Sequence, residues 1–271
     1  MDNIAFIGGG NMARSLIGGL VPGRVAAASL HVAEPVDALR DALARDFGVH
    51  VSPDNATAAR AADTWVLGVK PQVLREVCEA LSPIAQGSRP LIVSIAAGIT
   101  TAQLDRWLGG RMAIVRAMPN TPALVGAGVT GLFANARVHA QQRERTQHLL
   151  NAAGRTVWID DEARMDAVTA VSGSGPAYVF LLAEAMQAAG EAEGLSPDAA
   201  RVLAYQTILG AGRMLCESDV DAAELRRRVT SPNGTTHAAV QSFEADGFRA
   251  LVQRAVHAAA VRGKELSDAN D

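Results

Sequence analysis

The sequence predicts an α/β protein in two parts, a doubly wound parallel sheet followed by an all-helical domain. Two observations predict this organisation. Up to residue 159, short apolar runs alternate with amphipathic helical patterns, as in parallel sheets whose strands are connected by helices. From Glu162 onwards we find long alanine- and leucine-rich helical patterns and no convincing strand. We therefore expect one domain over residues 1–160 and a second over residues 161–271.

The composition limits the class of protein. The chain has 271 residues, 49% hydrophobic and 4% aromatic, which suffices for one large domain or two ordinary ones with aliphatic cores. The net charge of −3 gives no reason to expect a nucleic-acid or membrane partner. No apolar stretch is long enough to span a bilayer, and the histidines show no metal-ligand spacing, so we expect no metal.

Cysteine usage and the first strand predict a cytoplasmic protein. Cys78 and Cys216 form no Cys-x-x-Cys pair, so we expect two buried thiols in a reducing compartment. Because the first expected strand starts at residue 3 or 4, we expect no signal peptide.

The first domain should contain a series of short buried strands. In such sheets, ligands bind beyond the carboxyl ends of the strands. Small or polar residues follow each expected strand, as that geometry requires. The strands are expected at residues 4–7, 29–33, 49–51, 64–69, 91–95, 112–116 and 156–159, with helices at 13–20, 36–47 and 72–81 and a short one capped by Asp54 or Asn55.

A glycine-rich turn after the first strand predicts a Rossmann-type dinucleotide site. Gly8 permits the turn, Gly10 lets the backbone approach a pyrophosphate, and the small Ala13 lets the next helix pack closely. Amides at the start of that helix would face the phosphates. A glycine turn without a ligand is the alternative. The candidate pyrophosphate-binding residues are Ile7, Gly8, Gly9, Gly10, Asn11 and Met12.

The second domain should consist of helices with clear start signals. Pro176 stands where a first helical turn tolerates proline, and Ser196 before Pro197 is typical of a capped start. Another helix should begin within residues 230–236. The apolar faces exceed what a small monomeric domain can bury, so we expect them to pack against another subunit.

Five separated motifs show that the chain resembles the pyrroline-5-carboxylate reductase family over nearly its whole length. The last two are the specific ones, because a generic dinucleotide-binding protein has no reason to carry both. The motifs are FIGGGNMA at 6–13, VKPQ at 69–72, RAMPNTP at 116–122, GSGPAY at 173–178 and VTSPNGTT at 229–236.

The resemblance implies a fold, an activity and an assembly. It implies a Rossmann domain with a helical domain that interlocks with a partner subunit, and hydride transfer from NADPH or NADH to 1-pyrroline-5-carboxylate, giving L-proline. Family members form homodimers, often assembled further into homodecamers. Two alternatives stay open: another NAD(P)-dependent imine or hydroxyacid reductase, and a cofactor-binding protein without turnover. The segment 230–236 fits the pyrroline reductases better than either alternative.

The resemblance also implies further cofactor-binding residues. Asn55 matches an asparagine near the adenosine half, with a helix cap as the alternative. For Lys70 the alternative is a solvated lysine. For residues 118–120 it is a rigid loop shaped by Pro119 and Pro122, which is compatible with cofactor binding. The residues on the ribose and nicotinamide side are Val69, Lys70, Pro71, Ala96, Ala97, Gly98, Met118, Pro119 and Asn120.

The substrate residues implied by the resemblance lie mainly in the segment 230–236. Amides at a helix start favour an anion, here the substrate carboxylate. The residues implied are Ser231, Gly234, Thr235 and Thr236, with the Thr236 hydroxyl near the imine nitrogen as the catalytic group, and Asp219 at an acidic position near the substrate. A capped helix start and a solvated Asp219 are the alternatives.

Two positions, Asn233 and Glu34, depart from what the family resemblance leads us to expect. The family usually has glycine at position 233, and asparagine tolerates the left-handed conformation better than most residues. Glu34 follows the second strand, where a carboxylate accepts hydrogen bonds from the ribose 2′-hydroxyl of NADH and repels a 2′-phosphate. The alternatives are a solvent-facing Glu34 and a phosphate contact from Arg40. We expect both cofactors to be used, NADH better than in a typical family member.

Overall fold

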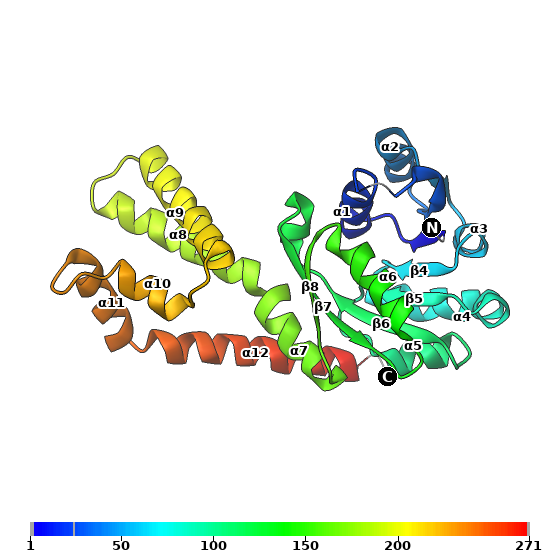
Figure 1. The fold of residues 1–271 in the computed structure, drawn as a ribbon. Helices are drawn as coiled ribbons and strands as arrows, with labels where there is room; N and C mark the ends of the chain where they lie inside the picture. The colour runs from blue at the N-terminus through cyan, green and yellow to red at the C-terminus, as the bar shows by residue number, and fades with distance from the viewer. Residues whose placement is uncertain (1–2, 24, 270–271) are drawn as a thin grey trace. The chain divides into compact units, whose positions relative to one another are not determined.

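The computed structural model describes residues 3–23 and 25–269, which divide into two compact units (Figure 1). Unit 1 comprises Met1–Ser174 and Ala259–Asp271, and unit 2 comprises Gly175–Ala258. We describe each unit by itself. The boundary expected between residues 160 and 161 stays a prediction, because compactness alone does not decide which segments fold independently.

Unit 1 is built on an eight-stranded sheet in the order β3-β2-β1-β4-β5-β6-β7-β8 (Figure 1). The first six strands have the order of a doubly wound dinucleotide-binding domain. The strands are β1 (Ile4–Ile7), β2 (Leu30–Ala33), β3 (His50–Ser52), β4 (Thr64–Leu67), β5 (Leu91–Ser94), β6 (Ala113–Met118), β7 (Gly128–Ala134) and β8 (Gly154–Trp158).

The sheet is parallel except at one pair. The pairs among β1 to β6 are parallel, as predicted, and so is β7 with β8. The pair β6·β7 is antiparallel, with Met118 opposite Gly131. β7 was not predicted, because two glycines interrupt its apolar run. Gly131 has a packing reason, since a Cβ there would lie 2.4 Å from Cγ1 of Val168.

Helices cover both faces of the sheet and bury two separate cores. In β1, Ile4 and Phe6 face one core, whereas Ala5 and Ile7 face the other, because successive strand residues point to opposite faces. Helices on the first face are α1 (Asn11–Leu20), α2 (Asp37–Phe47) and α6 (Ala140–Asn151), and helices on the second are α3 (Asn55–Arg60), α4 (Pro71–Ser88) and α5 (Thr101–Trp107).

Two short segments lead from the sheet to unit 2. α7 (Met165–Val168) continues directly into a π-helix, η4 (Thr169–Gly173), in which the amide of Ser174 donates to the carbonyl of Thr169 at 2.8 Å. Short π-helical turns of this kind often occur at functional sites. The 3₁₀ segments of unit 1 are η1 (Ala27–Ser29), η2 (Thr121–Val125) and η3 (Glu162–Arg164).

Unit 2 is helical, and after Trp158 the described residues contain no strand, as predicted. The side chain of Ser196 caps α9 by accepting from the amide of Ala199, which confirms the expected start at Pro197. The helices are α8 (Gly175–Ala192), α9 (Pro197–Glu217), α10 (Ala222–Arg228), α11 (Thr235–Ala245) and α12 (Phe248–Asp268), whose last residues belong to unit 1.

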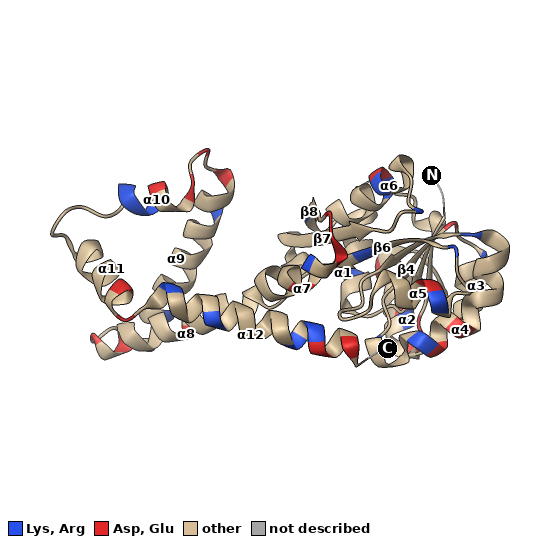
Figure 2. Cartoon of the chain, turned by 90° about the horizontal axis from the view of Figure 1, so that it is seen from below, with Lys and Arg blue, Asp and Glu red and all other residues tan. Residues whose placement is uncertain are grey.

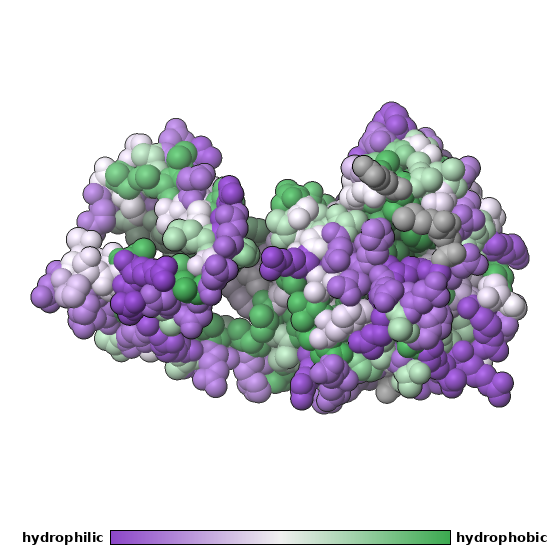
Figure 3. Space-filling view, in the orientation of Figure 1, coloured by the Kyte–Doolittle hydropathy of each residue, from purple (hydrophilic) through white to green (hydrophobic). Residues whose placement is uncertain are grey.

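Large apolar side chains lie on the surface of unit 2 (Figure 3). Phe180 and Leu181 on α8 are 60% and 66% exposed in the single chain. Contiguous apolar surface of this kind marks interfaces. One expectation is corrected here: Cys78 is buried as predicted, but Cys216 on α9 is exposed.

Charged residues of both signs are interspersed on the helices of both units (Figure 2). On α10, Arg227 and Arg228 both pair with Glu224, and on α12, Lys264 pairs with Asp268. No helix of the described ranges is long and apolar enough to cross a membrane. Within the same ranges, histidine, cysteine and carboxylate side chains form no cluster that could hold a metal ion.

Candidate active site

The glycine turn lies where β1 ends between its neighbours β2 and β4. Gly8 has a φ of +101°, and a Cβ there would lie 2.9 Å from the carbonyl carbon of Gly68. The Gly8 amide donates to the carbonyl of Ala33 at 3.0 Å. Only glycine fits this left-handed and crowded position. The structure thus confirms the tight turn after β1 that the sequence predicted.

The start of α1 has the properties of an anion site. Its N-cap is Gly10, which offers no side-chain acceptor to the first amides. A Cβ at Gly10 would meet no atom within 4 Å, so the backbone there borders open space. Ala13 is 2% exposed and packs into the core under the turn. These residues fit a pyrophosphate, because uncapped amides and open space occur together.

Glu34 is buried beside the glycine turn, with 6% of its surface exposed. Its carboxylate accepts from the amide of Gly9 at 3.0 Å and from the amide of Val36 at 2.9 Å. The alternative that Glu34 points to solvent is therefore wrong. The guanidinium of Arg40 donates to Asp37 at 2.7 Å and to the carbonyl of Glu34 at 3.0 Å.

Asn55 is the first residue of α3, next to the carboxyl end of β3. The cap of this helix is Asp54, whose carboxylate accepts from the amides of Thr57 at 2.8 Å and Ala56 at 3.3 Å. A further hydrogen bond from the Thr57 hydroxyl is the main reason that the pKa of Asp54 is lowered. Because Asp54 does the capping, the half-buried Asn55 side chain is not needed for it.

The ends of β4 and β5 carry the next two predicted groups. Lys70 is exposed and precedes α4, which begins at Pro71 without a side-chain cap. After β5, Ala97 is exposed, whereas Gly98 is buried with a φ of +71°. A Cβ at Gly98 would lie 3.6 Å from the Cβ of Leu266, so this glycine packs against the end of α12.

The loop 118–120 after β6 is fixed by its own contacts. A Cβ at Gly173 would lie 2.6 Å from Cε of Met118, so these two residues are closely packed. Asn120 is 9% exposed, and its side chain makes two hydrogen bonds. Its Oδ1 accepts from the amide of Val129 at 3.0 Å, and its Nδ2 donates to the carbonyl of Ser172 at 3.1 Å. These contacts fix the loop and are compatible with both the cofactor role and the rigid-loop alternative.

The predicted cofactor residues all belong to unit 1 and lie at or shortly after the carboxyl ends of strands. In a doubly wound sheet these ends share one edge, which is where dinucleotides bind. Ile7 and Met118 are the last residues of β1 and β6, and the others follow β1, β2, β3, β4, β5 and β6. The structure therefore brings the whole predicted cofactor set to one edge of the sheet.

The predicted substrate segment in unit 2 forms a turn and then a helix start. The amide of Gly234 donates to the carbonyl of Ser231 at 3.1 Å, which closes a turn with Pro232 at its second position. Asn233 has a φ of 57°, so it adopts the left-handed conformation that the sequence required of it. α11 then begins at Thr235 behind Gly234, again without a side-chain cap. The alternative of a side-chain-capped helix start finds no support here.

Among Thr230 and the polar side chains predicted to bind substrate, Thr230 has a structural partner and the others are exposed. The hydroxyl of Thr230 donates to the carbonyl of Arg226 at 2.6 Å, at the end of α10. Asp219 is exposed in the loop between α9 and α10, and the cap of α10 is Asp221. Ser231, Thr235 and Thr236 are exposed in the single chain and are available to a ligand.

One buried charge was missed by the sequence analysis. Arg116 on β6 is 4% exposed, with Glu162 at 3.6 Å and Asp166 at 3.4 Å. Glu162 also accepts from the amide and the hydroxyl of Thr101 at 2.7 and 2.6 Å. These contacts anchor the segment leading to α7. The only signal of this buried charge in the sequence was the position of Arg116 just before the Met-Pro-Asn motif.

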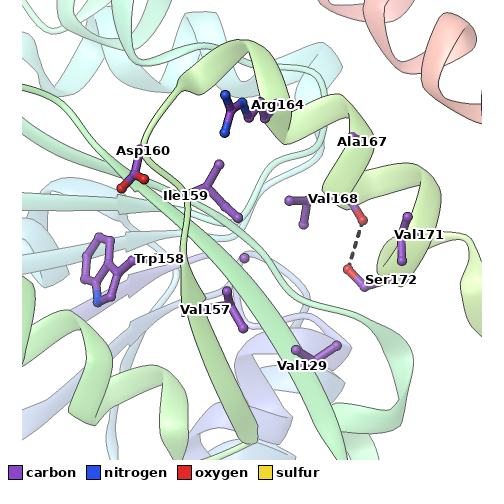
Figure 4. A pocket seen from close by; sticks show the side chains of 11 residues that line it. Val129, Val157, Trp158, Ile159, Asp160, Arg164, Ala167, Val168, Val171 and Ser172 are labelled. Atoms are coloured by element: carbon purple, nitrogen blue, oxygen red, sulfur yellow. Dashed lines mark hydrogen bonds between the residues drawn. The ribbon is translucent and has the colours of Figure 1, made fainter. Parts of the chain in front are cut away.

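A pocket on unit 1 borders the loop that carries Asn120, whose hydrogen-bond partners Val129 and Ser172 both line it (Figure 4). It is lined by β7, β8 and the segment from α7 to η4, and valines such as Val129, Val157 and Val171 make it largely apolar. The hydroxyl of Ser172 turns back to its own helix and donates to the carbonyl of Val168 at 2.9 Å. None of the predicted cofactor or substrate residues lines this pocket.

Comparison with known proteins gives close relatives over the full length. The chain is 55% identical to a pyrroline-5-carboxylate reductase of Pseudomonas aeruginosa, over 98% of this chain and 97% of that protein. The structure of a pyrroline-5-carboxylate reductase from Coxiella burnetii has a TM-score of 0.95, with 43% identity and 98% of both chains covered. That of Plasmodium falciparum pyrroline carboxylate reductase with NADP bound has a TM-score of 0.84, with 30% identity and 98% of both chains covered.

Two family models match different parts of the chain. Residues 3–98 match a model described as NADP oxidoreductase coenzyme F420-dependent, and residues 162–266 match one described as pyrroline-5-carboxylate reductase dimerisation. A Rossmann domain with an uncapped anion site, joined to a helical dimerisation domain, defines the class of two-domain dinucleotide-dependent oxidoreductases. Within this class, the chain belongs to the pyrroline-5-carboxylate reductase family.

Proposed function

We propose that the protein reduces 1-pyrroline-5-carboxylate to L-proline with NAD(P)H, the last step of proline biosynthesis. Membership of the pyrroline-5-carboxylate reductase family is the observation that carries this proposal. The uncapped start of α1 and the turn 231–234 before α11 support it, because the reaction needs one site for a pyrophosphate and one for a carboxylate.

The cofactor is held by the edge of the sheet in unit 1. The amides at the start of α1 bind the pyrophosphate, and the residues after β4, β5 and β6 border the ribose and nicotinamide. When bound, the nicotinamide supplies the hydride that the imine carbon accepts. Ile7, Gly8 and Gly9 shape the turn. Asn55 lies toward the adenosine half, and its side chain is available because Asp54 caps α3.

The substrate is held by the start of α11 in unit 2. The amides behind Gly234 and the hydroxyls of Ser231 and Thr235 bind the carboxylate. This fixes the ring, and fixed orientation supplies a large share of the rate. The hydroxyl of Thr236 donates toward the imine nitrogen, because the imine accepts a hydride best as the protonated iminium. Asp219 is assigned a supporting role near the substrate.

The helical domain makes the protein a homodimer in this proposal. The match to a dimerisation domain and the exposed apolar residues of α8 support a dimer. Further assembly into a homodecamer and a cytoplasmic location complete the proposal.

A purified-protein assay tests the proposed function. NAD(P)H absorbance should fall when 1-pyrroline-5-carboxylate is added and stay constant without it, with L-proline formed in equal amount. Turnover of other imines or hydroxyacids but not of this imine would favour another reductase. Cofactor binding without any turnover would show a binding protein instead.

A further inference from the structure

The carboxyl ends of β2 and β3 carry two carboxylates, Glu34 and Asp54. The strands are neighbours, with Ala33 opposite Ser52, so the residues that follow lie at the same edge of the sheet. Asp54 is held by the amides of α3. In doubly wound folds the ribose 2′ position of a dinucleotide lies at the end of the second strand. This is the position at which NADH and NADPH differ.

Glu34 cannot turn away from this position without losing two hydrogen bonds. Its Oε2 accepts from the amide of Gly9, in the glycine turn, and its Oε1 from the amide of Val36. The side chain is buried, and a Cβ at Gly9 would lie 3.0 Å from the Cβ of Glu34. Each carboxylate oxygen has a second lone pair, so both can still accept from a ribose hydroxyl.

The cation nearest in sequence is already engaged. Arg40 Nη2 donates to Asp37 at 2.7 Å, and Nη1 donates to the carbonyls of Glu34 at 3.0 Å and Pro35 at 3.3 Å. Its side chain is 18% exposed. A 2′-phosphate would therefore meet a fixed carboxylate and a guanidinium that must first give up its partners.

We propose that Glu34 selects NADH over NADPH in this protein. The inference rests on the proposed function and deepens it by naming the preferred cofactor. Glu34 has two roles: it fixes the glycine turn through Gly9, and it accepts from the 2′-hydroxyl of the adenosine ribose. The preference is opposite to what the NADP-bound relative from Plasmodium falciparum suggests.

Fluorescence titration of the purified protein with NADH and with NADPH tests this without any turnover. We expect the Kd for NADH to be lower than that for NADPH by about tenfold or more, equivalent to about 1.4 kcal/mol. Glu34→Gln removes the charge at nearly the same shape and should abolish most of this preference. Glu34→Asp keeps the charge and should retain it.

Arg40→Ala tests the opposite explanation, in which Arg40 binds the 2′-phosphate of NADPH. If the wild-type protein binds NADPH more tightly than NADH and Arg40→Ala removes that advantage, then Arg40 binds the 2′-phosphate and the proposal is overturned. An unchanged Kd ratio in Glu34→Gln overturns it as well. A preference for NADH in protein that never reduces 1-pyrroline-5-carboxylate would instead refute the proposed function and leave the role of Glu34 standing. Binding of neither cofactor would refute both.

Discussion

The side chain of Asn120 donates a hydrogen bond to the backbone of Ser172, in the π-helix η4. Asn120 Nδ2 donates to the carbonyl of Ser172 at 3.1 Å. In an α-helix this carbonyl would accept from the amide of residue 176, but Pro176 has no N–H. Asn120 therefore ties the loop after β6 to the π-helix that leads out of unit 1.

Asn120→Asp should lower kcat/KM by roughly tenfold, because a bond to a buried carbonyl contributes about 1–3 kcal/mol. Aspartate still accepts from the amide of Val129 but no longer donates to Ser172. Steady-state kinetics with varied cofactor and varied imine measure the loss, which should appear mainly on the cofactor side.

Pro176→Ala provides the matched control for Asn120. Alanine supplies an amide at position 176 that can reach the carbonyl of Ser172 but does not tie the loop after β6 to it. We therefore expect Asn120→Asp combined with Pro176→Ala to stay as slow as Asn120→Asp alone. Recovery of activity in the double variant would mean that the unsatisfied carbonyl, and not the position of the loop, caused the loss.

Local patterns predicted the first six strands because each is a short apolar run next to an amphipathic helix. β7 was missed because Gly128 and Gly131 serve packing that sequence periodicity does not encode. α4 runs to Ser88 although its pattern was expected to stop at residue 81. The helix continues through Pro83, and the fully buried Ala85 packs it into the core beyond that point.

The candidate site also has parts that local sequence patterns predict and parts that depend on distant contacts. The glycine turn and the left-handed Asn233 follow from local backbone rules, so the sequence was sufficient for them. One partner of Glu34, Gly9, is 25 residues away in the chain, and one partner of Asn120, Ser172, is 52 residues away. Only the fold brings such groups together, which is why their roles had to come from the structure.

Thr236→Ala should lower kcat far more than it weakens cofactor binding. Thr236 belongs to the proposed substrate segment in unit 2, whereas the glycine turn is in unit 1. A group that assists proton transfer contributes about 100-fold or more to the rate. Thr236→Ser keeps the hydroxyl and should retain most of the activity. If cofactor affinity, measured by fluorescence titration, fell as much as kcat, Thr236 would belong to the cofactor site and not to the substrate site.

Leu181→Glu should dissociate the protein. Leu181 is 66% exposed in the single chain, and a charge in an apolar interface is strongly unfavourable. Light scattering at micromolar concentration should show a stable oligomer for the wild type and a smaller species for the variant. Leu39→Glu, at an exposed position of α2 in unit 1, is the control and should not change the molar mass. A monomeric wild type would contradict the expected intersubunit core.

Cys78 should be unreactive in the folded protein. Burial, with a smaller contribution from Glu79, raises the pKa of its thiol to about 12, and the thiolate is the reactive form. In a Cys216→Ser variant, a chromogenic disulfide reagent at pH 8 should therefore titrate no thiol until urea unfolds the chain, and then one. Rapid reaction before unfolding would show that the core around α4 opens.

Asn233 adopts a left-handed conformation in the turn of the proposed substrate segment. Its φ of 57° is left-handed, and the turn it forms places Gly234 before the amides of α11. Asn233→Gly should leave the KM for the imine within about twofold, since glycine adopts this conformation freely. Asn233→Val should raise this KM, because a β-branched residue in the left-handed region costs about 1–2 kcal/mol. The KM for the cofactor should stay constant in both variants, since the turn belongs to unit 2. If valine were tolerated without any change in the KM for the imine, the turn 231–234 would not set the position of the substrate carboxylate.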